Sequence, residues 1–264
     1  INQARMSPMG FMDRYQAKLT QFPVITDIIR KTLYPSHPLY EHRELVEAAR
    51  AHSLDMTMNN FFQHRPCNSA PGTSWEERVK QFYEPEGPLA ENIGFGFPNA
   101  LDMIAAWFES NSHRMNMLNP KYNLGGVGFK NRRWTLNLAQ GVNHVDNPIA
   151  SGSHFISPEG KMTFLANYYS EKEFDEGKGP KEAHVIINKE KYPIVLPTHT
   201  FDTFTQGHMG TYIFETDQTE NCRTYHFEFV HEDGVVSRYP ERGSLVTVGE
   251  GKTSCKHEYV EDDQ

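Results

Sequence analysis

Four histidine and glutamate side chains in the first half of the chain are the residues best suited to chemistry. His64 follows two phenylalanines, and Glu109 and His113 lie four residues apart in AAWFESNSHRMNML. Glu91 stands in LAENIGFG, where two glycines predict a loop whose backbone can approach closely. If one helix continues through the last stretch, Glu109 and His113 lie on one face with Cβ atoms about 5–6 Å apart. Two imidazoles and two carboxylates, each leaving an apolar element, can line one cavity, so we predict a shared site.

The residue types point to a divalent metal. Two neutral imidazoles, His64 and His113, leave coordination open for water or a carboxylate, as in catalytic rather than structural zinc sites. Glu91 and Glu109 are candidate bases if a metal polarises water, and the alternative is that they orient the imidazoles. The chain has no HExxH motif and no G-x-S-x-G elbow. The competing interpretation is that both histidines are surface or hydrogen-bonded residues.

The first 120 residues have the periodicity of helices that would position these side chains. The pattern predicts helices over 7–19, 40–62, 72–83 and 98–110. In the longest, residues spaced i, i+3, i+4, i+7 from Leu45 to Met56 form an apolar face that includes His52. We interpret His52 as a satisfied core histidine. Asn99 is the expected N-terminal cap of the fourth helix.

The pattern changes to strands after residue 120. Segments 125–130 and 133–142 predict a hairpin, and the Pro-, Gly- and Ser-rich segment 145–153 is the best linker candidate. Beyond it, alternating apolar residues predict strands over 162–169, 182–196, 210–216, 224–230 and 235–240, with Asp233-Gly234 as a hairpin turn. We therefore expect two domains, residues 1–146 and 147–264, of which the second is a small immunoglobulin-like β-sandwich.

The composition argues against two classes of function. The 264 residues include 34 Asp and Glu against 26 Lys and Arg, so the net charge is −8, whereas a general nucleic-acid binder needs a basic surface. No apolar run approaches the length of a transmembrane helix. The three cysteines leave two alternatives open. Either Cys67, Cys222 and Cys255 are all reduced and buried, or a Cys222–Cys255 bond stabilises the C-terminal region by about 3–4 kcal/mol.

An ordered set of motifs resembles a known family. The chain reads HSLDM, FFQH, ENIGFG, WFESNSHRMNMLNPKYNLGGVGF and WTLNLAQG. In this order the motifs resemble the bacterial branch of the CAP superfamily, also called SCP-like after the cysteine-rich secretory proteins, over about residues 1–144. His64 matches the histidine after the FF pair, Glu91 the glutamate of E-N-[IL], and His113 the histidine of H-R-x-N-[ILM]. Glu109 is the fourth member of the implied tetrad. The segment RPCNSAPGTS departs from the family, so we expect a different rim.

The resemblance implies an α/β fold, an α-β-α sandwich with a central cleft. It also implies a protein that is usually secreted, its signal peptide removed, and a His/Glu tetrad that binds a divalent metal such as zinc in some members. The C-terminal half resembles β-sandwich extensions of some bacterial members. We expect a non-catalytic extracellular binding or interaction module whose cleft takes a metal, a peptide or protein, or a small lipid-like ligand. The alternatives are a metal-dependent peptidase or other hydrolase, and lipid or sterol carriage.

Overall fold

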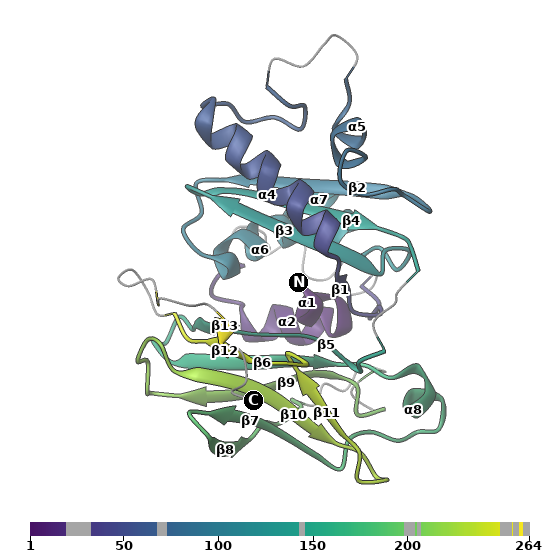
Figure 1. Ribbon diagram of the computed structural model, residues 1–264, viewed down its shortest axis with the longest axis vertical. Helices are drawn as coiled ribbons and strands as arrows, with labels where there is room; N and C mark the ends of the chain where they lie inside the picture. Colours follow the sequence, from purple (N-terminus) through teal and green to yellow (C-terminus); the bar gives the residue numbers. More distant parts are fainter. Residues whose placement is uncertain are drawn as a thin grey trace. The chain divides into compact units, whose positions relative to one another are not determined.

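The computed structural model describes residues 1–19, 33–67, 73–142, 146–197, 204, 207–248, 255 and 259–260. The chain forms two compact units, one of residues 3–145 with Ile1 and one of residues 146–264 with Asn2 (Figure 1). In the first unit the elements follow the order α1 (Asn2–Met6), α2 (Pro8–Arg14), β1 (Tyr40–Glu41), α4 (Arg43–Met58), α5 (Trp75–Val79), β2 (Leu89–Phe95), α6 (Ala100–Glu109), α7 (Asn111–Leu118), β3 (Leu124–Lys130) and β4 (Arg133–Ala139).

The four strands of the first unit form one sheet in the order β1-β3-β4-β2. A Cβ added at Gly126 of β3 would lie 2.2 Å from the backbone of α4, whereas one at Gly94 of β2 would lie 2.0 Å from Met103 of α6. Gly126 pairs with Asn137 of β4 and Gly94 pairs with Trp134. Residues 134 and 137 point to opposite faces of β4 because side chains alternate along a strand. Helices α4 and α6 therefore contact opposite faces of the sheet.

Helix α4 confirms the predicted long helix in a shorter form. Strand β1 takes up the first residues of the predicted span, and the helix ends at Met58 with Asn59 as its C-cap, before Asn60 adopts a φ of 50°. The buried face includes Leu45, His52 and Met56, as predicted. The predicted cap of α6 is also present, since Asn99 accepts a hydrogen bond from the Asp102 amide at 2.9 Å.

The segment around Glu91, expected as a loop, is strand β2, and all five residues from Ala90 to Gly94 are buried. Glycine occurs here because the strand must pass close to helix α6. The added Cβ at Gly94 also comes within 3.4 Å of Trp107, which leaves no room for a side chain. The glycine in this motif thus indicates a buried strand rather than a loop.

The second unit is almost entirely β-structure. Its elements are β5 (Ile149–Ile156), β6 (Met162–Tyr168), α8 (Glu171–Asp175), β7 (Glu182–Ile187), β8 (Glu190–Pro193), β9 (Gly210–Thr216), β10 (Thr224–Val230), β11 (Val236–Tyr239), β12 (Ser244–Val246) and β13 (Tyr259–Val260). One sheet has the order β13-β12-β10-β7-β8, with β11 also paired to β10, and the other has the order β5-β6-β9.

The predicted linker is largely strand β5. Glycine is needed at position 152 of this strand because a Cβ there would lie 2.5 Å from the Phe227 ring. Aromatic side chains of both sheets meet in the core. Phe164 of β6 contacts Tyr225 of β10 with ring centroids 5.0 Å apart, and Tyr168 stacks on Phe229 at 4.8 Å. The shared face of Tyr225, Phe227 and Phe229 is thus buried between two sheets, in agreement with the expected all-β region.

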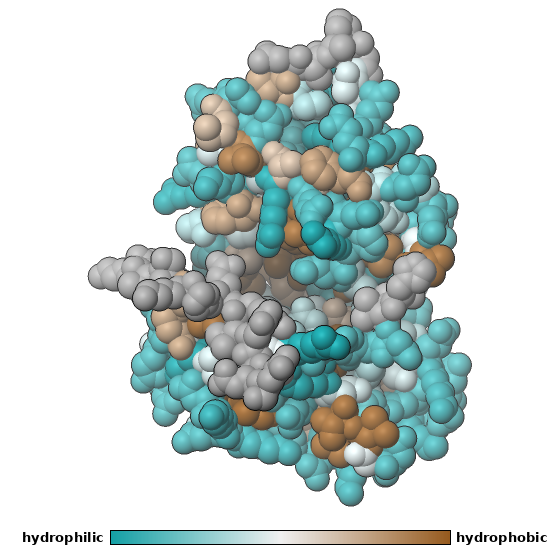
Figure 2. Space-filling model, viewed as in Figure 1, coloured by the Kyte–Doolittle hydropathy of each residue, from teal (hydrophilic) through white to brown (hydrophobic). Residues whose placement is uncertain are grey.

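A disulfide joins Cys222 and Cys255, whose Cα atoms are 5.5 Å apart, so the second of the two cysteine alternatives is confirmed. Cys67 is a free, half-buried thiol. Among the described residues, no helix has both the length and the apolar character needed to span a bilayer. On the face shown in Figure 2, hydrophobic residues occur in small groups surrounded by hydrophilic ones.

Candidate functional site

The loop after α4 holds His64 in place through contacts back to that helix. His52 Nε2 is 3.0 Å from the carbonyl oxygen of Gln63, the residue before His64. Asp55 Oδ2 accepts a hydrogen bond from the Cys67 amide at 3.0 Å. His52 and Asp55 of the HSLDM motif therefore fix the loop on both sides of His64. His52 has the core position that the sequence predicts, with one of its two ring nitrogens bonded.

Glu91 lies under His64 and is almost completely buried, with 1% of its side chain exposed. Its Oε1 is 2.8 Å from His64 Nδ1. Its Oε2 accepts from Arg78, at the C-terminal end of α5, and from the Asn137 amide at 3.0 Å when the amide nitrogen faces Glu91. The buried Arg78 guanidinium compensates the carboxylate charge, without which burial of Glu91 would be costly.

The contact with Glu91 sets the tautomer of His64. A carboxylate only accepts hydrogen bonds, so His64 Nδ1 carries the proton and donates to it. The other ring nitrogen, Nε2, is then an acceptor in the neutral imidazole. With 44% of its side chain exposed, His64 can present this nitrogen to a ligand from solvent.

His113 lies in the first turn of α7 and is held from both its side chain and its backbone. Its Nδ1 is 2.8 Å from the Ser110 hydroxyl, and its carbonyl accepts from the Asn92 amide at 2.9 Å. Burial, and then the nearby charge of His64, lower the pKa of His113 below its usual value. The lowered pKa favours the neutral imidazole, and no described residue is hydrogen-bonded to its Nε2.

The helix predicted over 98–110 is α6, and it does not continue to His113, so the condition for placing Glu109 and His113 on one helix face is not met. Helix α6 ends at Glu109, and Ser110 adopts an extended ψ of 122° before α7 begins. The guanidinium of Arg114 explains the break, since its Nη1 donates to the carbonyls of Phe108 and Glu109 at 2.7 and 3.1 Å. The i,i+4 relation between Glu109 and His113 does not hold, and the place of Glu109 in the site stays a prediction.

Three contributing residues escape the sequence reasoning. The i,i+3 spacing of Ser110 and His113 resembles a helix-cap pattern and was available as a signal. No sequence signal identifies Arg78 and Asn137, because the tertiary fold alone brings them into contact with Glu91. Within the described parts of the chain, no set of three or more His, Cys, Asp or Glu side chains is arranged to hold a metal ion. The geometry therefore offers two imidazoles supported by a hydrogen-bonded shell.

The chain is similar in part to known proteins. The model of the CAP, or cysteine-rich secretory protein, family matches residues 1–138. Two uncharacterised proteins of Bacillus subtilis (strain 168) are similar. YkwD is 34% identical over 93 residues, which are 35% of this chain and 35% of YkwD. The membrane protein YlbC is 31% identical over 92 residues, which are 35% of this chain and 26% of YlbC. The match thus spans about a third of one relative and about a quarter of the other.

Two solved structures are similar over about half of the chain. An extracellular protein of Bacillus anthracis that contains an SCP domain shares 25% identity, with a TM-score of 0.37 and coverage of 48% of this chain and 41% of that one. A cysteine-rich secretory protein of Staphylococcus aureus shares 20% identity, with a TM-score of 0.35, and the match covers 48% of this chain and 39% of that one.

Proposed function

Because the chain belongs to the cysteine-rich secretory protein family, we propose that its first unit is an extracellular binding module in which His64 and His113 hold one divalent metal ion. The observation that supports this proposal is the state of the two imidazoles. Each has Nδ1 engaged, by Glu91 or by Ser110, and His64 is close enough to lower the pKa of His113. Both Nε2 atoms are left to bind an ion.

Glu91 acts in this proposal as the group that orients His64. Metal-binding histidines commonly donate their second ring N–H to a carboxylate, which fixes the ring and makes it a better ligand. The Ser110 hydroxyl would do the same for His113 by accepting from its Nδ1–H. Both oxygens of Glu91 are occupied by His64 and Arg78, which favours this orienting role over that of a base.

The donor set suits zinc. Zinc binds imidazole nitrogen readily, and two protein ligands leave positions for water or for a group of a bound molecule. A bound zinc ion would polarise such a group. A peptide or protein ligand with a carboxylate, carbonyl or imidazole would complete the coordination. A hydrolase would need a further carboxylate that is free to take a proton.

An extracellular location agrees with the cysteine chemistry. Disulfides persist in oxidising compartments and are rare in the cytosol, and the second unit contains the Cys222–Cys255 bond. Together with the secretory family, this bond supports a module that works outside the cell.

The test is a zinc titration by calorimetry on tag-free, metal-stripped protein in a Cys67→Ser background, which excludes the free thiol near His64. We expect one saturable site, lost in His64→Ala and in His113→Ala. In Glu91→Gln we expect it to be weakened about 10- to 100-fold. The control is His208→Asn, an exposed position in the second unit with a φ of 58°, which asparagine tolerates. The proposal would be refuted if the parent protein has no saturable site. It would also be refuted if the His64 and His113 variants bind zinc as tightly as the parent protein does.

A further inference from the structure

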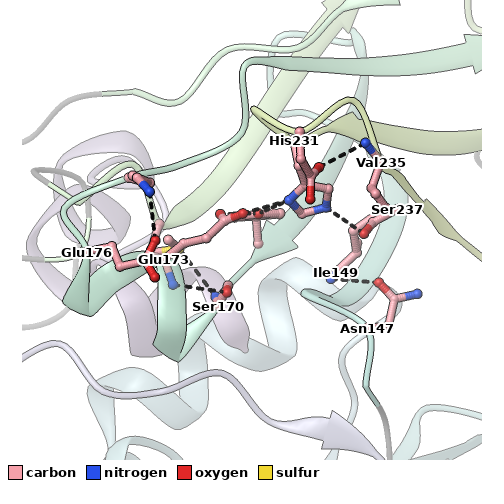
Figure 3. Close-up of polar contacts among 12 residues, drawn as sticks. Asn147, Ile149, Ser170, Glu173, Glu176, His231, Val235 and Ser237 are labelled. Carbon is pink, nitrogen blue, oxygen red and sulfur yellow. Dashed lines mark hydrogen bonds and ion pairs between the residues drawn. The ribbon is translucent and has the colours of Figure 1, made fainter.

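A second chain of hydrogen-bonded groups lies in the second unit, where the β10–β11 hairpin meets α8 (Figure 3). His231 directly follows β10, Ser237 lies on β11, and Glu173 lies in α8. His231 Nε2 is 2.7 Å from Ser237 Oγ, and His231 Nδ1 is 2.7 Å from Glu173 Oε1. Both distances fall within the range expected between a nucleophile and its base, and between that base and the group that orients it.

Tyr168 determines how the protons are arranged. Its hydroxyl donates to Glu173 Oε2, and burial, followed by this hydrogen bond, raises the pKa of Tyr168 above its usual value, so it stays a donor. Glu173 Oε1 then accepts from Nδ1–H of His231. A neutral imidazole with its proton on Nδ1 is an acceptor at Nε2, so the Ser237 hydroxyl donates to His231.

The local backbone fixes these side chains. The His231 amide donates to the Val235 carbonyl at 2.8 Å, and the Gly234 amide donates to the His231 carbonyl at 3.0 Å. Gly234 has a φ of +83°, a conformation that glycine adopts without strain. The Glu173 amide donates to the Ser170 hydroxyl at 3.3 Å, which caps α8. The hairpin and the capped helix therefore hold the groups in their observed positions.

We propose that Ser237 is a nucleophilic serine, activated by His231 and oriented through Glu173, that accepts acyl groups from esters. Ser237 Oγ bonds to the carbonyl carbon while its proton passes to His231 Nε2. The ester C–O bond then breaks, and the proton leaves with the alcohol. Water releases the acyl group by the same sequence, with water in place of the serine hydroxyl.

The surroundings of Ser237 affect how a substrate reaches the hydroxyl and which acyl groups fit beside it. Ser237 is half-buried, so part of the residue is in contact with solvent. Val235, two residues earlier, is 58% exposed and offers apolar surface, which favours a short apolar acyl chain. The site lies in the second unit and is independent of the proposed metal site.

The experiment treats the full chain with an alkyl fluorophosphonate, from which a nucleophilic serine displaces fluoride. We expect a single adduct, located on Ser237 by peptide mass spectrometry. Loss of the base should slow labelling about 100-fold or more in His231→Gln, and Glu173→Gln should also slow it. Ser244→Ala, at a half-buried serine on β12, serves as the matched control and should label like the parent protein.

Two results would overturn the inference. One is the absence of an adduct on Ser237 in the parent protein, which requires no variant to fold. The other is an unchanged labelling rate in His231→Gln whose near-ultraviolet circular dichroism matches that of the parent, because a purely structural hydrogen bond would give that result.

Discussion

Lowering the pH should destabilise the first unit through His52. The side chain is fully buried, and its Nδ1 has no hydrogen-bond partner among the described residues. A second proton on the ring would therefore be buried without an acceptor. Burial, and then the charge of Arg78, lower the pKa of His52 from 6.5 to about 4.

The direction and size of the effect follow from linkage. Between about pH 6.5 and pH 4 the unfolded chain takes up a proton that the native state refuses, so stability present at neutral pH is lost as the pH falls. From pH 7 to pH 5, a pKa of about 4 in the folded state against 6.5 in the unfolded state lowers the free energy of unfolding by about 2 kcal/mol.

Urea unfolding followed by tryptophan fluorescence measures this loss. The three tryptophans, Trp75, Trp107 and Trp134, all lie in the first unit, so the signal reports that unit alone. His52→Gln keeps an N–H for the Gln63 carbonyl and does not titrate. The stability difference between pH 7 and pH 5 should be about 2 kcal/mol smaller in the variant than in the parent protein. The same pH dependence in both proteins would refute the reasoning.

The same urea assay tests two further contacts. Gly126→Ala places a Cβ 2.2 Å from the α4 backbone and should cost about 3 kcal/mol. In Gly125→Ala the new Cβ lies nearest to the flexible end of Leu39, at 3.3 Å, so the loss of stability should be clearly smaller. Equal losses in the two variants would contradict the close packing of Gly126 against α4. Arg5→Met removes a buried guanidinium that donates to four backbone carbonyls and should cost at least about 3 kcal/mol. As a control, Arg14→Met at an exposed position should change stability by less than about 0.5 kcal/mol. Comparable losses of stability in both variants would show that the four hydrogen bonds of Arg5 are not the source of the effect.

Local sequence signals predicted the elements that carry their own pattern. The spacing of Leu45, His52 and Met56 identified the buried face of α4, and Asn99 identified the start of α6. Alternation predicted strands β9 and β10 with their observed bounds. Strand β2 escaped prediction because it is buried along most of its length and shows no alternation.

The sequence by itself determined the family and named His64, Glu91 and His113 as candidate residues. The tertiary structure alone decided what those residues touch. Glu91 is hydrogen-bonded to Arg78 and His64, which lie 13 and 27 residues away in the chain. Glu173 is hydrogen-bonded to His231, which lies 58 residues away. Periodicity and capping reflect the conformation of neighbouring residues. A charge pair or a hydrogen-bonded triad arises only where packing brings distant segments together, so no local pattern records it.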